Sequence, residues 1–246
     1  MSIIEGAIAT KAALASKYRR VNKIYISYNK SGSDVTFITR QAELKHIEVE
    51  KVRPDRIEEL ASGKTHGGIL ADVSERKLQS LTSLLYKEQP FLALVEGVED
   101  SYNLGYVIRS LYAFGCDGII LKDHIVDFDD STIIKSSAGA SEMLPICHVG
   151  DLEMALDVLK ENGIRIISAY RGGEPVCLYD YDFTGKGILI CLGGPLRGLS
   201  KTVLDNSDDF IYIPYASDFR NALNGSSAMA VIASEIFRQK SMEPEE

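Results

Sequence analysis

Short apolar runs that alternate with helical patterns after Pro90 constrain the fold of this chain more than any other feature. Strands of this length without polar alternation are typical of a mostly parallel sheet, in which helices bury both faces. The sequence therefore predicts an α/β fold for this region. The expected strands span residues 91–98, 118–121, 164–169, 187–192 and 210–213, and the expected helices span 104–114, 131–142, 151–162, 200–206 and 226–239.

The part of the chain before Pro90 has weaker and shorter signals. Helical patterns over residues 4–16, 38–46 and 55–62 alternate with strand-like runs at 23–28, 47–52 and 67–73, which indicates a small α/β unit. Residues 74–89 are polar with a helical leucine spacing, and we expect them to form a linker or bridging helix that Pro90 ends. We therefore expect three parts, which are a first domain at 1–74 (the head), a linker at 75–90 and a second domain at 91–246.

Charge is distributed unevenly between these parts. The chain has a formal net charge of −8, yet residues 1–70 hold 12 Lys and Arg against 8 Asp and Glu. A mildly basic head on an acidic body is compatible with nucleic-acid contact through the head, but the charge alone favours an incidental asymmetry. Scattered histidines and cysteines without a paired motif argue against a metal site. Because no leader or membrane-spanning run is found, we expect a cytoplasmic protein without a membrane partner.

The first segment that could carry chemistry follows the apolar run at 91–98. It contains Asn103, Gly105 and Arg109 at the start of an expected helix. Asn103 is a good candidate for the N-cap, because its side chain can accept a hydrogen bond from a free backbone N–H group. Taken alone, the segment is explained by a helix cap followed by a surface arginine.

The second segment, residues 192–200, is rich in glycine and follows the apolar run at 187–192. Gly193 and Gly198 have the spacing of a phosphate-binding loop, but Leu199 occupies the position of its lysine. The pattern also differs from the dinucleotide-binding fingerprint. The loop can hold a small cofactor through its backbone, or it is simply a tight connection between strand and helix.

The third segment, residues 220–228, leads into the last expected helix. Either Asn224 or Ser226 can cap this helix, and the small residues around them allow a close approach of the backbone. A well-capped helix start explains the segment when it is considered alone.

Together and in this order, the three segments resemble the signature motifs of the SpoU/TrmH family of RNA ribose methyltransferases, within the SPOUT superfamily. Residues 136–140 and Leu144-Pro145 are similar to the stretch between its first and second motifs. In the head, Glu5-Gly6 and residues 65–68 resemble the family's amino-terminal substrate-binding domain, which is similar to a small ribosomal protein. The matching residues of the three motifs are Asn103, Gly105 and Arg109, then Gly193, Gly198, Leu199 and Ser200, then Leu223, Asn224 and Ser226.

The resemblance implies a carboxyl-terminal deep trefoil knot that binds S-adenosylmethionine (SAM), and transfer of its methyl group to a ribose 2′-hydroxyl. It implies RNA as the partner, with ribosomal RNA favoured over tRNA, and a homodimer without a metal. The implied catalytic residues are Asn103, Arg109, Asn224 and Ser226. The implied cofactor-binding residues are Leu192, Gly193, Gly194, Gly198, Ile211, Ile213, Pro214, Leu223, Asn224 and Ser227.

The second motif departs from the family pattern. Pro195 stands where the family commonly has Glu, Arg197 stands where another acid is frequent, and Ala222 replaces a frequent Ser. The main hypothesis from the resemblance is an active RNA 2′-O-methyltransferase, and these departures are the reason for an alternative. The alternative is a non-catalytic relative that binds RNA or SAM. An ordinary doubly wound nucleotide-binding enzyme is disfavoured by Leu199.

Overall fold

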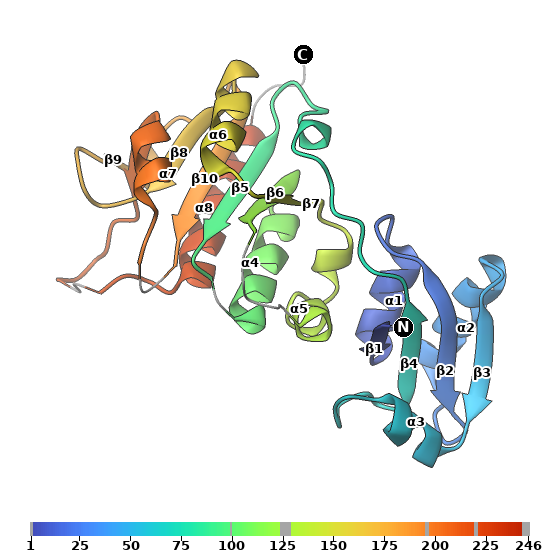
Figure 1. The fold of residues 1–246 in the computed structure, drawn as a ribbon. Helices are drawn as coiled ribbons and strands as arrows, with labels where there is room; N and C mark the ends of the chain where they lie inside the picture. The colour runs from blue at the N-terminus through green and yellow to red at the C-terminus, as the bar shows by residue number, and fades with distance from the viewer. Residues whose placement is uncertain (1, 99, 124–128, 195–196, 219–220, 243–246) are drawn as a thin grey trace. The chain divides into compact units, whose positions relative to one another are not determined.

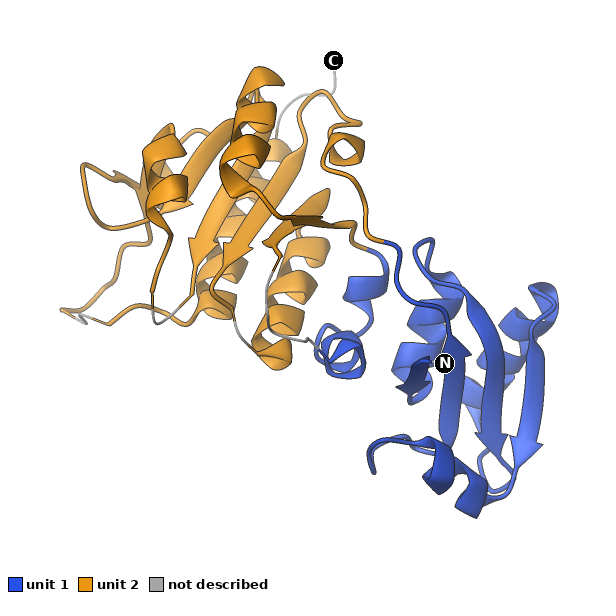
Figure 2. Cartoon of the chain, in the orientation of Figure 1, with its two compact units in different colours: residues 1–77, 128–143 blue, residues 78–127, 144–246 orange. Residues whose placement is uncertain are grey.

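The computed structural model divides into two compact units (Figure 2). Unit 1 comprises residues 1–77 and 128–143, and unit 2 comprises residues 78–127 and 144–246. None of the helices in the described part of the chain is both long and apolar enough to cross a membrane. The structure describes residues 2–98, 100–123, 129–194, 197–218 and 221–242.

Unit 1 contains a four-stranded mixed sheet with the strand order β1-β4-β2-β3 (Figure 1). β2 and β3 are parallel, whereas β4 is antiparallel to both β1 and β2. Its strands are β1 (Ser2–Glu5), β2 (Val21–Ser27), β3 (Glu48–Val52) and β4 (Ile69–Val73), and the helices before residue 77 are α1 (Ala7–Ala15), α2 (Ser33–Leu44) and α3 (Pro54–Leu60).

The amino terminus differs from the sequence prediction. The expected helix over residues 4–16 is wrong at its start, because Ser2–Glu5 forms strand β1 and helix α1 begins only at Ala7. Gly6 separates the two elements with φ 94°, a conformation that glycine adopts without steric cost. The alanine-rich composition of the segment hides this break.

Residues 128–143 belong to unit 1 although they lie between two strands of unit 2 in the sequence. They form α5 (Asp130–Ser136) and the 3₁₀ turn η2 (Ala140–Glu142), so the single helix expected over 131–142 is interrupted, with Gly139 in the left-handed region at φ 86°. Ile134 is fully buried and joins the core formed by α1, α2 and the sheet. The segment is therefore an integral part of this unit's core.

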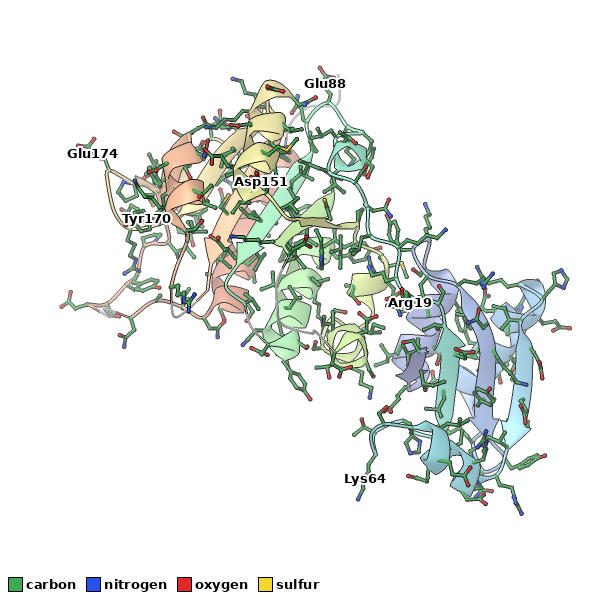
Figure 3. The ribbon with its side chains drawn as sticks, in the orientation of Figure 1. Arg19, Lys64, Glu88, Asp151, Tyr170 and Glu174 are labelled. Atoms are coloured by element: carbon green, nitrogen blue, oxygen red, sulfur yellow. The ribbon has the colours of Figure 1, made fainter. Side chains whose placement is uncertain are left out.

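A buried ion-pair network fixes this segment within unit 1. The Arg19 side chain is 1% exposed, and its Nε lies 3.1 Å from Oε2 of Glu142, which is also 1% exposed. Arg19 Nη2 lies 2.7 Å from Asp130 Oδ2, and Arg76 Nη1 lies 3.4 Å from Glu142 Oε1. Figure 3 shows Arg19 in unit 1. Glu142 thus compensates two guanidinium groups that water does not reach.

Unit 2 contains a seven-stranded sheet with the order β7-β6-β5-β10-β8-β11-β9. Every pair of neighbouring strands is parallel, which confirms the predicted mostly parallel α/β architecture. β7 and β9, which are four and two residues long, were not predicted. The strands are β5 (Phe91–Glu96), β6 (Gly118–Lys122), β7 (Ile146–Val149), β8 (Arg165–Ala169), β9 (Val176–Cys177), β10 (Ile188–Gly193) and β11 (Asp209–Tyr212).

Helices cover both faces of this sheet. Helices α6 (Leu152–Glu161) and α7 (Lys201–Asn206) pack against one face, where their apolar residues share a core with β5, β8 and β10 (Figure 1). Helices α4 (Ser101–Ala113) and α8 (Gly225–Lys240) lie side by side in a second layer. Because both faces are covered, residues 91–95 of β5 are all buried, which explains the uninterrupted apolar run in the sequence.

The bridging helix predicted for residues 74–89 is wrong. Within this stretch only the 3₁₀ turn η1 (Thr82–Leu84) is helical. The Lys77 N–H group donates to the Tyr18 carbonyl in unit 1, and the Gln79 N–H group donates to the Ile146 carbonyl in unit 2. Leu84 is buried in the core of unit 2, with Leu81 and Leu85 packed beside it. These leucines therefore pack into the core of unit 2 from a largely extended chain, although their spacing is helical.

Candidate active site

The three candidate segments follow strands of unit 2 at one edge of its sheet. β5 ends at Glu96, β10 at Gly193 and β11 at Tyr212. Because the strands are parallel, the segments that begin at residues 97, 194 and 213 all leave the sheet at its carboxyl edge. Open α/β sheets bind their ligands outside this edge. The candidate active site is therefore located there.

The first segment begins α4 with a different cap from the one predicted. Asp100 is the N-cap, and its Oδ1 accepts a hydrogen bond of 2.9 Å from the Asn103 N–H group. The prediction that Asn103 caps the helix is wrong, because the helix already begins at Ser101. The Asn103 side-chain amide donates to Oδ2 of Asp100. Asp100 thus holds the exposed Asn103 side chain at the start of α4.

Arg109 lies on the solvent-facing side of α4. With about 100° per residue, it shares a stripe with Tyr102 and Tyr106, and it projects roughly a third of a turn away from Asn103. Tyr102 is 61% exposed and Tyr106 is 47% exposed. Within the described ranges, no ion pair engages the Arg109 guanidinium. It is therefore available to an anionic ligand such as a phosphate group.

The glycine-rich segment brings the ends of β5 and β10 into backbone contact. A Cβ atom on Gly194 would lie 1.9 Å from the carbonyl oxygen of Gly97, and one on Gly193 would lie 2.3 Å from the carbonyl carbon of Gly198. The Gly198 N–H group closes the loop by donating to the Gly194 carbonyl over 3.0 Å. Side chains at Gly193 or Gly194 are excluded, so a ligand here would meet backbone atoms.

Glu96, which was not predicted as a site residue, ties the first segment to the second. Its Oε2 accepts a hydrogen bond of 2.7 Å from the Ser200 N–H group. Ser200 in turn caps α7 by accepting from the Val203 N–H group over 3.4 Å. The sequence signal was an acid in the last position of a strand, opposite Gly193 in the register. Pro195, where the family commonly has Glu, lies outside the described residues.

The third segment confirms that Asn224 is the N-cap of α8. Its Oδ1 accepts hydrogen bonds from the Ser227 N–H group and the Ser226 hydroxyl, each over 2.8 Å. The amide nitrogen of Asn224 therefore keeps its donors for a ligand. A Cβ atom on Gly225 would lie 3.5 Å from Cδ2 of Leu192. The start of α8 and the end of β10 are thus in contact, as the predicted cofactor residues require.

Two of the remaining predicted cofactor residues line a hollow of about 700 Å³ next to β11. Ile213 and Pro214 line the hollow, whereas the Ile211 side chain is 1% exposed and offers a ligand only its backbone. The Leu223 N–H group donates to Oη of Tyr215 over 2.9 Å, which ties the hollow to the third segment. The lining is completed by Arg171, Pro175, Tyr212, Tyr215, Ser217 and Asp218.

The four predicted catalytic residues occupy two neighbouring helices. Asn103 and Arg109 are on α4, whereas Asn224 precedes α8 and Ser226 lies in its first turn. Although α4 and α8 pack together, no hydrogen bond joins either residue of the first pair to the second pair in the described part of the chain. Asn103 lies in the first turn of α4, whereas Arg109 lies more than two turns from the start of that helix. No group of three or more potential metal ligands occurs among the described residues.

Two family models match the chain in order along the sequence. The model of RNA 2′-O ribose methyltransferase substrate binding matches residues 3–96, and the model of the SpoU rRNA methylase family matches residues 90–234. The second match contains all three candidate segments.

Relatives and solved structures agree with these matches. A tRNA/rRNA methyltransferase of Synechocystis is 31% identical over 98% of this chain, which spans 63% of that relative's length. RlmB of Shewanella oneidensis, a 23S rRNA (guanosine-2′-O-)-methyltransferase, is 30% identical over 97% of both chains. The SpoU methyltransferase AviRb from Streptomyces viridochromogenes, solved with its cofactor AdoMet, superposes with a TM-score of 0.80 at 24% identity, covering 98% of this chain and 91% of AviRb. The chain therefore belongs to the SpoU rRNA methylase family, a family of RNA methyltransferases.

Proposed function

We propose that this protein transfers a methyl group from SAM to a ribose 2′-hydroxyl of ribosomal RNA. The observation that carries the proposal is the glycine-built carboxyl edge, where Gly194 lies against Gly97 and Leu192 lies against the start of α8. Ribosomal RNA is favoured over tRNA because the Shewanella relative, a 23S rRNA enzyme, matches over 97% of both chains. As an RNA-modifying enzyme, the protein would act in the cytoplasm.

The residues of the carboxyl edge fit SAM. Backbone groups of Leu192, Gly193, Gly194 and Gly198 face one side of the proposed site, and further contacts would come from Ile211, Ile213, Pro214, Leu223, Asn224 and Ser227. When bound, SAM supplies a methyl carbon that its sulfonium makes electrophilic. The path of the chain supports a trefoil knot. β8 separates β11 from β10, yet α8, which follows β11, begins beside Leu192.

The side chains around this edge would position the RNA. Arg109 is unsuited to act as the base, because a guanidinium group stays protonated in proteins. It would instead bind an RNA phosphate with two parallel hydrogen bonds. Asn103 and the free amide donors of Asn224, together with the Ser226 hydroxyl, would orient the ribose so that its 2′-oxygen and the methyl group lie in line.

Arg109→Ala is expected to lower kcat/KM for methyl transfer to unmodified ribosomal RNA by about 10- to 100-fold. The reason is the loss of a charge-assisted pair, which contributes about 1.5–3 kcal/mol. The affinity for SAM should not change. Transfer of labelled methyl groups and calorimetry with SAM measure the two quantities. Lys201→Ala, which removes an exposed cation from α7 with a side chain 90% exposed, is the matched control and should behave as wild type.

The same measurements separate the alternative functions. Equal labelling by wild type and Arg109→Ala would remove Arg109 from the mechanism. SAM binding without transfer by the wild type would support the alternative of a non-catalytic relative, to which the Pro195 departure points. If calorimetry detects no heat with SAM, the cofactor assignment itself is wrong.

The proposed domain organisation is a substrate-binding head at residues 1–74, a linker at 75–90 and a catalytic domain at 91–246, of which residues 128–143 belong to the core of the head. A hollow of about 560 Å³ in unit 1 supports RNA contact by the head. Arg20, Lys45 and His46 line it and are exposed, and none of its lining residues carries a carboxylate. An exposed basic hollow without acids is suited to phosphate groups of RNA.

The double variant Arg20→Ala/Lys45→Ala is expected to weaken binding of ribosomal RNA and to flatten its salt dependence. Each lost phosphate contact reduces the slope of log affinity against log salt by about 0.7 to 0.9. Filter binding at several salt concentrations measures this slope. The control Lys11→Ala/Lys23→Ala removes two cations that already pair with Asp34, Glu48 and Glu50. Equal slopes for both double variants would contradict RNA contact at this hollow.

We also propose a homodimer that uses the outer faces of α4 and α8. Large aromatic side chains are exposed there, and a smaller hollow of about 360 Å³ lies between Phe114, Tyr179 and α8. Exposed aromatic groups that cluster on neighbouring elements favour a protein–protein interface. The exposed aromatic residues are Tyr102, Tyr106, Tyr112, Tyr179 and Phe237.

A further inference from the structure

We propose that the hollow beside β11 binds a base of the RNA substrate, next to the pair formed by Arg171 and Tyr215. The inference deepens the proposed function and rests on it. Arg171 follows β8 in the loop that also carries Tyr170 and Glu174, which Figure 3 labels, and Tyr215 follows β11. The Arg171 guanidinium carbon lies 4.2 Å from the centroid of the Tyr215 ring. The two loops thereby form one side of the hollow.

The hollow has the size and the chemistry that a nucleobase requires. A volume of about 700 Å³ falls within the range of small-ligand sites. Tyr212, Ile213 and Pro214 offer apolar surface, whereas Ser217 and Asp218 offer polar atoms for the edge of a base. Proteins that recognise unpaired RNA stack its bases on aromatic rings and on arginine guanidinium groups. Both kinds of surface are present here.

Charge favours RNA over the cofactor as the occupant. Arg171 is exposed, and no ion pair neutralises it among the described residues. An available guanidinium attracts the phosphates on either side of a base. SAM carries a sulfonium, an ammonium and one carboxylate, so its net charge is positive and the guanidinium favours it less. Moreover, among the described residues, neither 192–194 and 197–200 of the glycine-rich segment nor 222–227 line the hollow. The hollow thus lies beside the proposed cofactor loops and shares only Ile213 and Pro214 with them.

Tyr215 connects the hollow to the proposed catalytic residues. Its Oη accepts the hydrogen bond from the Leu223 N–H group, and Leu223 directly precedes Asn224, the cap of α8. A base that packs against Tyr215 would therefore be positioned relative to Asn224 and Ser226. This makes Arg171 and Tyr215 positioning residues for the RNA substrate.

The test compares Arg171→Ala, Tyr215→Leu and Tyr215→Phe with wild type. An unmodified ribosomal RNA transcript and SAM are the probes, with filter binding for RNA and calorimetry for SAM. Arg171→Ala and Tyr215→Leu are expected to weaken RNA binding about tenfold each, because each removes one surface of the stack. Tyr215→Phe keeps the ring and should retain RNA affinity within twofold. SAM affinity should not change in Arg171→Ala, which leaves the hydrogen bond from the Leu223 N–H group to Oη of Tyr215 intact.

Two other outcomes would overturn the proposal. Weaker SAM binding with unchanged RNA binding would assign the hollow to the adenine of the cofactor and overturn the proposal. Unchanged affinity for both ligands would overturn it as well. Failure of the proposed function is distinguishable, because the wild type itself would then bind no SAM or transfer no methyl group. The RNA affinities of the variants can be compared in either case.

Discussion

Gly194→Ala is expected to abolish SAM binding and to destabilise unit 2. The new Cβ atom would lie 1.9 Å from the carbonyl oxygen of Gly97, and both groups belong to backbone at the ends of adjacent buried strands. No flexible side chain can move aside, so the glycine-rich segment must leave its position. We expect a loss of about 3 kcal/mol or more of stability, the upper range for overpacking. Calorimetry with SAM and thermal unfolding measure both effects.

Gly225→Ala is the matched control for this prediction. It lies in the neighbouring part of the proposed cofactor site, but its Cβ atom would be 3.5 Å from Cδ2 of Leu192, an ordinary contact distance. As the first residue of α8, position 225 should gain about 0.4–1 kcal/mol from alanine, because the unfolded chain loses freedom. If Gly194→Ala bound SAM as tightly as Gly225→Ala, the glycine-rich segment would not hold the cofactor.

Glu142→Ala is expected to unfold or strongly destabilise unit 1. The substitution removes the carboxylate shared by Arg19 and Arg76, whose side chains are 1% and 8% exposed. Burial opposes the charge on Arg19, but the attraction of Glu142 and Asp130 outweighs it, so the pKa of Arg19 is raised. Burial lowers the pKa of Arg76. Breaking a buried ion pair on one side costs about 3–5 kcal/mol, because an uncompensated charge is left behind.

Asp130→Ala provides the control, since it removes a partner of the same arginine from a half-exposed position. The Asp130 side chain is 49% exposed, so its contribution should stay near the roughly 0–1 kcal/mol of surface pairs. Hydrogen exchange of the amides in β2 and β4, followed against denaturant, isolates unit 1 from unit 2. Similar protection in Glu142→Ala and Asp130→Ala would contradict the role assigned to the buried network.

The architecture of unit 2 was predictable because its strands are buried on both faces. Residues 91–95 and 188–192 read as uninterrupted apolar runs, and the structure places them in adjacent parallel strands. The failures lie where local pattern and tertiary contact disagree. Leu84 and its neighbours have helical spacing, yet they pack into the core of unit 2 from a largely extended segment. The backbone of this segment donates hydrogen bonds to Tyr18 in unit 1 and to Ile146 in unit 2. Such pairing depends on residues distant in the sequence.

The candidate site was predictable to the extent that its residues act locally. Asn224 caps the helix that immediately follows it, and a short pattern suffices to indicate this. Glu96 and Tyr215 were not predicted, because their contacts depend on the folded chain. Glu96 accepts a hydrogen bond from Ser200 through the register of β5 and β10, and Tyr215 accepts one from Leu223. The shift of the cap from Asn103 to Asp100 shows that two possible caps three residues apart leave the start of a helix ambiguous.

The assignment of residues 128–143 to unit 1 has a consequence for the exchange of heads between relatives. The chain passes between the two units three times, after residues 77, 127 and 143. A fragment that ends at residue 77 would lack Ile134, which completes its core, and Glu142, which compensates Arg19. A transplanted head must therefore bring two separate stretches of sequence.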